Sequence, residues 1–280
     1  MNGLAIVRVQ GNARGTSTNN TSISVTLSHA PANGNLLVAT IECAGSSTNP
    51  TVSSISQTRV TWTRQQGYNS NDAPDTEIWA GVVSSGASNS ITINLTGGTG
   101  GTYMNVANIS EYSGLLASGF LDQTTTNSSG SGKSASADTG TTVTTTQPSE
   151  LWIGTVTAYD SSSRACGMSS PTNGFTLLDG ANFANGVYNV SNAYLEKIVS
   201  TTGTANSGAT VATSTYWTGC IATFKTSATP TPPPSDPCAA LQAALDALSP
   251  GDFLTEAEYE QALRYFTAQL RACRRKYGYP

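Results

Sequence analysis

The chain has 280 residues, of which 11% are charged, and its formal net charge is −4. This charge argues against a nucleic-acid-binding surface, which needs a concentrated basic face. No stretch approaches the run of about 18 apolar residues that a membrane-spanning helix needs.

Short apolar runs separated by turn residues fill the chain from Leu4 to Lys225. Within one run, Ile91, Ile93 and Leu95 alternate with polar residues, which is the two-residue period of a half-buried strand. We expect strands at 4–9, 22–27, 36–43, 60–64, 77–83, 90–95, 102–112, 150–156, 174–179, 193–199 and 216–225. Because no helical segment separates these runs, the pattern predicts a mainly β fold, an antiparallel jelly-roll β-sandwich, over residues 1–225.

The order of these elements also resembles a known group of proteins. The order is GNLLVATI, VTWTRQ, EIWAGVV, SITINL, NISEYSG, a Ser/Thr-rich stretch, ELWIGTV and WTGCIATFK. It resembles the jelly-roll, broadly concanavalin-like β-sandwich modules of phage virion proteins and bacterial surface proteins, over residues 4–226. The resemblance implies a structural, decorating or glycan-contacting role, and it supplies no catalytic residues.

One acidic cluster, in NSNDAPDTEIW, holds Asp72, Asp75 and Glu77. Oxygen ligands at this spacing on a loop are a candidate calcium site, and solvated turn carboxylates are the alternative. Read as a glycosidase pair, Asp75 and Glu77 would have to face each other across a cleft, whereas the pattern places both on one strand edge. We therefore predict a protein that is not an enzyme and has no cofactor apart from this calcium candidate.

The aromatic residues fall into two groups. Four tryptophans lie inside strand patterns and are expected in the core: Trp62, Trp79, Trp152 and Trp217. Four others lie in loop-like segments and are candidates for contact with a glycan: Tyr68, Tyr159, Phe183 and Tyr188.

Three further features are read as structural. His29 lies in a turn between two strands, and the run SGSGKS at 129–134 fails as a phosphate loop because position 127 is Asn127. Cys43, Cys166 and Cys220 lack the paired spacing of a zinc site. We expect Cys43 to be a buried thiol and both Cys43 and Cys220 to be free, although the sequence does not fix the state of these three cysteines.

The composition changes after the β region. Through residue 228 the chain has 19 charged residues, and from residue 236 onward it has 11 in 45. The segment 226–237, TSATPTPPPSDP, is rich in proline and predicts a stiff linker. The chain is therefore divided into a β-sandwich domain (1–225), a linker (226–237) and a helical hairpin domain (238–280).

The hairpin prediction comes from two apolar stripes at helical spacing. The first helix is expected to end at Ser249–Pro250–Gly251, and the second to open with a capping box of Thr255 and Glu258. One antiparallel register then pairs Leu248 with Leu263, Leu245 with Phe266, Leu241 with Leu270 and Cys238 with Cys273. This register predicts a disulfide between Cys238 and Cys273, and two reduced core cysteines are the alternative.

A second line of small residues runs along each predicted helix. These residues are Ala240, Ala244 and Ala247 on the first helix, and Tyr265, Ala268 and Ala272 on the second. Small residues allow another backbone to approach closely, so this line is a candidate attachment surface. The alternative is a solvated face on which alanine only favours the helix.

These features together predict a non-enzymatic phage virion structural protein: a capsid decoration, a fibre or a tail-associated surface module. The sequence begins at Met1, and its start, MNGLAIVRVQGNARG, lacks the pattern of a secretion signal, although the Ser/Thr/Gly/Asn-rich composition is typical of exposed proteins. A protein made in the host cytoplasm and displayed on a virion surface reconciles the two. The expected partners are other virion proteins, copies of the same chain and a host-surface glycan. The alternative is a bacterial cell-surface adhesin or extracellular carbohydrate-binding module.

Overall fold

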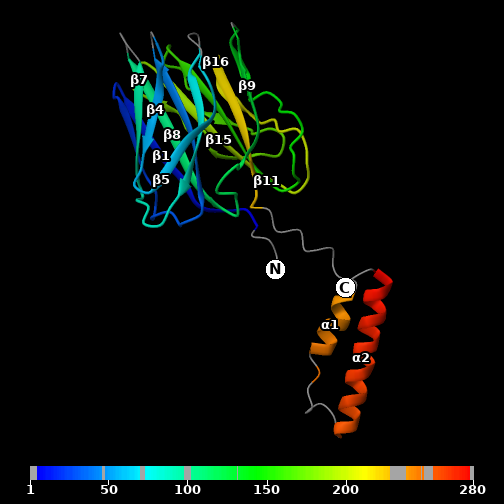
Figure 1. Cartoon of the computed structure of the whole chain (residues 1–280). Coiled ribbons are helices and arrows are strands. Elements are labelled where there is room, and N and C mark those ends of the chain that lie inside the picture. The colour runs from blue at the N-terminus through cyan, green and yellow to red at the C-terminus, as the bar shows by residue number, and fades with distance from the viewer. Residues whose placement is uncertain are drawn as a thin grey trace. The chain divides into compact units, whose positions relative to one another are not determined.

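The computed structural model describes residues 5–45, 48–69, 73–97, 102–130, 132–227, 238–246, 248 and 255–277, with the side chains of 239, 240, 243 and 277 excepted. The chain divides into two units, Met1–Ala228 and Thr229–Pro280, which we call the β body and the hairpin unit. Strands make up the first and two helices the second (Figure 1). Every strand pair in the described part is antiparallel, so the predicted mainly β, antiparallel class with a helical C-terminal part is confirmed.

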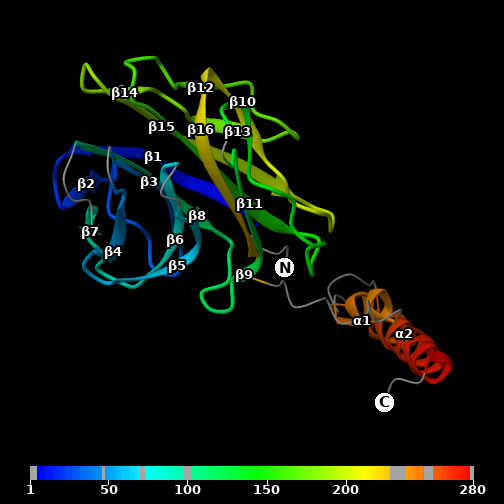
Figure 2. The ribbon, with the colours of Figure 1, turned by 90° about the horizontal axis from the view of Figure 1, so that it is seen from above.

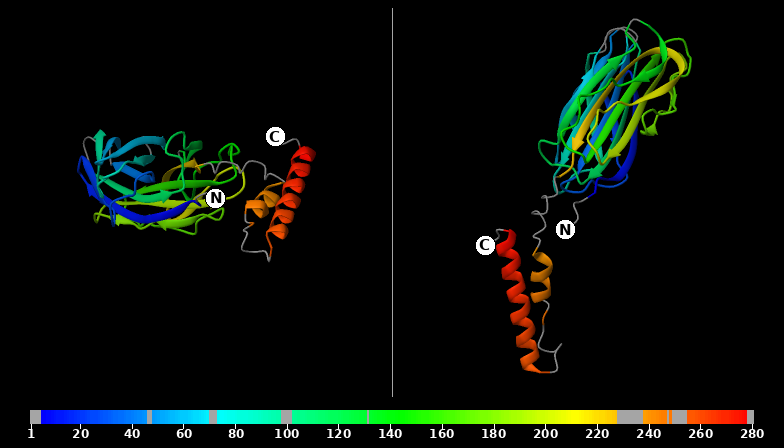
Figure 3. Two further views of the ribbon diagram at one scale, coloured as in Figure 1. Left: turned by 60° about the horizontal axis from the view of Figure 1, so that its bottom comes forward. Right: turned by 90° about the vertical axis from the view of Figure 1, so that its right-hand side faces the viewer.

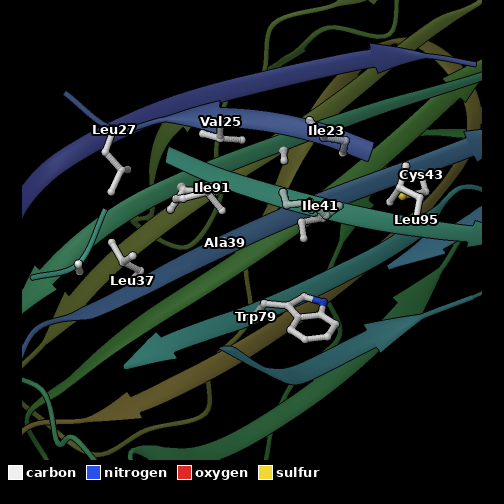
Figure 4. Packing of buried hydrophobic residues seen from close by; sticks show 14 of the residues in the cluster. Ile23, Val25, Leu27, Leu37, Ala39, Ile41, Cys43, Trp79, Ile91 and Leu95 are labelled. Carbon is white, nitrogen blue, oxygen red and sulfur yellow. The ribbon is translucent and has the colours of Figure 1, made fainter. Parts of the chain in front are cut away.

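The first half of the β body is a two-sheet unit. Its strands are β1 (Val7–Thr18), β2 (Ser22–Thr26), β3 (Leu36–Gly45), β4 (Pro50–Ser56), β5 (Val60–Tyr68), β6 (Asp75–Val83), β7 (Ser90–Gly97) and β8 (Tyr103–Ser113). They form a large sheet in the order β1-β8-β3-β6-β5 and a small sheet in the order β2-β7-β4. The alternating residues predicted for β7 belong to the core between these sheets, as Figure 4 shows for Ile91 and Leu95. Ile93, between them, is also fully buried.

The second half repeats this strand order. Its strands are β9 (Leu121–Ser128), β10 (Ser134–Asp138), β11 (Glu150–Asp160), β12 (Met168–Ser169), β13 (Thr176–Asp179), β14 (Phe183–Ala184), β15 (Asn189–Val199) and β16 (Gly208–Lys225). The long strand β16 pairs with β10 and β12 through its first part, and with β9 and β11 through its later part. The orders β9-β16-β11-β15-β13 and β10-β16-β12 therefore match β1-β8-β3-β6-β5 and β2-β7-β4.

The two halves meet through their large sheets, an interface that we call the seam (Figure 2). Leu36 and Val38 of β3 pack there with Leu151 and Ile153 of β11, and all four are buried. Because each large sheet is covered on both faces, β3 and β11 are buried along nearly their whole length. This explains why neighbouring residues on both faces of these strands are apolar, as in Leu36–Leu37–Val38 and Leu151–Trp152–Ile153.

The β body has several features that the sequence did not predict. It is built from two halves of matching strand order, and it contains the additional strands β4, β9, β10, β12 and β14. The ladder of β1 also continues to Thr18, well beyond the expected end at residue 9. The jelly-roll assignment and the family resemblance stay predictions.

The hairpin unit contains α1 (Ala239–Asp246) and α2 (Glu256–Tyr277), which lie side by side (Figure 3). The predicted disulfide between Cys238 and Cys273 is present, with 5.8 Å between the two Cα atoms. The capping box is also confirmed, because Thr255 N donates to Glu258 Oε2 at 3.0 Å and Glu258 N donates to Thr255 Oγ1 at 3.3 Å.

The apolar layers of the hairpin unit are fewer than predicted. Leu270, near the disulfide, is 6% exposed, whereas Leu263 is 38% exposed. The expected partner of Leu263 is Leu248, but α1 ends at Asp246, so Leu248 lies past the helix. The core of the unit is therefore concentrated at its disulfide end.

The boundary between the units falls slightly later than expected. Ser227, assigned to the linker from sequence, donates from its backbone N to Gly114 O at 3.0 Å, and Thr226 bridges to Leu115. These two residues belong to the β body, and the remainder of the predicted linker, 228–237, lies outside the described residues. Neither described helix combines the length and apolar character needed to cross a membrane.

Candidate functional site

The β body has two distinct ends. The chain enters and leaves at one of them, which we call the proximal end: Val7 pairs with Ser113, and Ser227 bonds to Gly114 (Figure 1). From its pairing with Lys225 there, β11 runs eleven residues to Asp160 at the other, distal end. At about 3.4 Å per residue, the distal end is roughly 35 Å from the chain exit.

A pocket of about 250 Å³ opens at the distal end, between the two halves. We call it the seam pocket. The first half contributes Asn49 and Pro74 to its walls, and the second half contributes Lys133, Tyr159, Asp160 and Tyr216. Neither half alone would form it, and interfaces of this kind are where ligand pockets are most often found.

Strand pairing positions the two tyrosines of the seam pocket. Tyr159 of β11 lies directly opposite Tyr216 of β16, so both side chains point to the same side of the sheet, toward the first half. Tyr159 also stacks on Tyr188, with 5.7 Å between ring centroids and 16° between planes. Burial, with Tyr188 and Asp160 nearby, raises the pKa of Tyr159 to about 12, so its phenol stays neutral.

The glycan-contact candidates are only partly brought together. Tyr159, Phe183 and Tyr188 pack around Val190 in one cluster, but of the four candidates only Tyr159 lines the seam pocket. Tyr68 ends β5 and its hydroxyl accepts a hydrogen bond from Ser128 Oγ at 3.4 Å.

Sequence reasoning missed most of the seam-pocket residues. Lys133 was visible in SGSGKS, but only as part of a rejected phosphate loop, and Tyr216 was read as part of the closing strand. No local pattern joins Asn49, Asp160 and Tyr216, because they meet only through the packing of the two halves.

The predicted acidic cluster does not form a loop site. Asp72 lies outside the described residues, and Asp75 and Glu77 are 1% and 2% exposed in β6. Among the described residues, no group of three or more His, Cys, Asp or Glu side chains is placed to hold a metal ion. The calcium interpretation needs accessible carboxylates, so the burial of Asp75 and Glu77 argues against it, and both residues lie on one strand as expected.

Glu77 and Asp75 are core groups with different electrostatic states. Glu77 accepts hydrogen bonds from Trp79 Nε1 at 2.6 Å and Val52 N at 3.1 Å, and it pairs with Arg64 at 3.2 Å. Burial, and then the adjacent Glu77 carboxylate, raise the pKa of Asp75 well above its usual range. Asp75 is therefore neutral at pH 7, while the Glu77 carboxylate is the ion-pair partner of Arg64.

The attachment candidates lie on the hairpin unit. Tyr265 is 59% exposed, Ala268 and Ala272 are exposed, and Ala244 is half-buried. The side chain of Ala240 and the whole of Ala247 lie outside the described part of the chain. On α2, therefore, the residues of the predicted attachment surface are exposed.

The three remaining cysteines, Cys43, Cys166 and Cys220, are free and buried. This confirms the prediction for Cys43 and Cys220 and gives Cys166 the same state. Burial raises the pKa of all three thiols, which suppresses the reactive thiolate form.

Comparison with known proteins gave no match to this chain from any protein-family model, curated protein or solved structure.

Proposed function

We propose that the protein is a non-enzymatic structural protein of a phage virion, a capsid decoration, fibre or tail-associated surface module, with the hairpin unit as its attachment element. The observation that supports this proposal is that the chain exit and the seam pocket lie at opposite ends of the β body. Its chain continues toward the hairpin unit from Ser227 at the proximal end, whereas the seam pocket opens at the distal end. The chain therefore leaves the β body at the end opposite the seam pocket.

The hairpin unit has the properties of a small docking element. The disulfide between Cys238 and Cys273 holds the two helices together, and α2 leaves Tyr265 59% exposed. An exposed aromatic side chain is suited to anchor a contact with another virion protein.

A bacterial cell-surface adhesin or carbohydrate-binding module is the second candidate. The observation that favours it is the aromatic cluster of Tyr159, Phe183 and Tyr188 beside the seam pocket. Both candidates use the β body for display and differ in what the hairpin unit is attached to.

Immunogold electron microscopy distinguishes the two candidates. Antibodies raised against the recombinant protein should label purified phage particles and should not label uninfected bacterial cells. Labelling of uninfected cells without labelling of particles would support the second candidate and contradict the first.

The attachment role is tested by particle incorporation. A chain lacking residues 238–280 and a Tyr265→Asp variant should both be lost from purified particles, as measured by mass spectrometry. Glu256→Gln, an exposed change at the start of the same helix, is the matched control and should incorporate normally. Normal incorporation of the shortened chain would place the attachment surface on the β body.

A further inference from the structure

We propose that the seam pocket binds one acidic saccharide unit, with its carboxylate paired to Lys133 and its ring lying against Tyr216. The inference goes beyond the virion assignment, because it holds equally for a β body displayed on a particle or on a cell. It rests on the size of the pocket, on its charge balance and on the fixed position of its walls.

The size of the seam pocket limits the ligand to a single ring. Its volume of about 250 Å³ lies just below the range of roughly 300–1,000 Å³ that is usual for drug-sized ligands. The wall combines tyrosine rings with polar groups, which suits a sugar because a sugar also presents both apolar C–H faces and hydroxyl groups.

The negative charge in the seam pocket is already balanced. Asp160 is 2% exposed, and it accepts hydrogen bonds from Arg164 Nη2 at 2.7 Å and from Ser162 N at 2.8 Å. Burial alone would raise the pKa of Asp160, but these bonds lower it below the usual value, so the carboxylate stays charged and paired with Arg164.

Lys133 has no carboxylate partner among the residues that the structure describes. Its Nζ lies 5.3 Å from the Tyr216 ring centroid, and no described carboxylate forms an ion pair with it. Lys133 is exposed, and Tyr216 is half-buried beside it. The seam pocket therefore presents, over an aromatic ring, a cation that no described carboxylate neutralises, which is the complement of a sugar that carries a carboxylate.

Lys197 also lies near an aromatic ring, but its ammonium group already has a hydrogen-bond partner. It lies 5.5 Å from the Trp152 ring centroid, but its Nζ donates to Asn173 O at 2.8 Å. Trp152 is itself only 5% exposed. Lys197 therefore serves as the matched control for Lys133.

The walls of the seam pocket are held in place from both halves. Thr218 Oγ1 donates across the seam to Pro74 O at 2.6 Å, and Asn49 Nδ2 donates to Ala73 O at 2.7 Å. On the opposite wall, Thr215 Oγ1 donates to Tyr159 O at 2.5 Å. A ligand would enter a pocket whose walls are already ordered, so little affinity is lost to ordering them.

The test is calorimetric titration of the full chain with two oligosaccharides that differ only in a carboxylate, one containing glucuronate and one containing glucose. We expect the acidic oligosaccharide to bind at least about tenfold more tightly, since a charge-assisted contact of about 1.4 kcal/mol corresponds to that factor. Lys133→Met should remove this preference and Tyr216→Ala should weaken binding of both sugars, while Lys197→Met should leave both affinities unchanged. Near-ultraviolet circular dichroism of each variant shows that the fold is retained.

Three results would overturn the inference: equal binding of both oligosaccharides, no binding of either to the folded wild-type chain, or full competition by inorganic phosphate at similar concentration. The last would identify a general anion site. Because particle labelling does not depend on sugar binding, each of these failures is distinct from a failure of the virion assignment.

Discussion

Loss of the bond between Cys238 and Cys273 should unfold the hairpin unit and leave the β body intact. The two cysteines are separated by 35 positions. In the chain-entropy model, closing a loop of about 36 residues contributes roughly 4 kcal/mol at 25 °C. Of the described apolar side chains in the unit, only Cys238 and Leu270 are buried, so little other packing compensates for the loss. A stabilisation of this size exceeds what such a small core supplies.

The assay is thermal unfolding followed by circular dichroism at 222 nm, with the β body monitored in parallel by its near-ultraviolet signal. Under reducing conditions, or in Cys238→Ser, the helical signal should be lost near room temperature while the near-ultraviolet transition keeps its midpoint. Ala272→Ser, an exposed change next to Cys273, is the control and should leave both transitions in place. Reduced protein that retains its helical signal with an unchanged midpoint would refute the entropic reasoning.

The buried carboxyls give two further predictions. Glu77→Gln should lower the free energy of unfolding by about 2–4 kcal/mol at pH 7, as measured by urea denaturation, because it removes the charged acceptor of Trp79 and the partner of Arg64. Asp75→Asn should lower it by less than about 1 kcal/mol, since Asp75 is already neutral. Equal costs would contradict this assignment of charge. Burial, with Asp122 nearby, raises the pKa of Glu150 from 4.5 to about 7. The folded state therefore holds this proton more tightly than the unfolded state, and the contribution of Glu150 to stability declines between pH 4.5 and 7, by up to about 3 kcal/mol. Over that interval Glu150→Gln should show a correspondingly flatter stability profile, and a profile parallel to that of the wild type would show that Glu150 titrates normally.

Local sequence patterns predicted the elements whose signal is contained in a few neighbouring residues. The alternation of Ile91 and Ile93 identified β7, and Thr255 with Glu258 identified the start of α2. The disulfide could be predicted because a hairpin of two antiparallel helices has few registers.

Features that depend on contacts between distant segments of the chain could not be predicted from the sequence. Strand β9 has the sequence LDQTTTNS, and every residue in it is half-buried. It therefore shows neither an alternation of apolar residues nor an apolar run from which a strand could be predicted. The burial of Asp75 follows from the small sheet that covers β6, and the seam pocket follows from the contact of two large sheets. These features come from surfaces that meet only in the folded chain, and single-sequence periodicity contains no information about them.

The arrangement of β16 has a mechanical consequence. If a ligand is held at the distal end while the chain is pulled at the proximal end, the tension enters at Lys225 and runs along β16 to Tyr216 at the seam pocket. Its hydrogen bonds to β9 and β11 lie perpendicular to that direction, so they are loaded together in shear and are not opened one after another. A strand loaded in shear resists far more force than one that is peeled, so the connection between the distal pocket and the chain exit is built to carry tension.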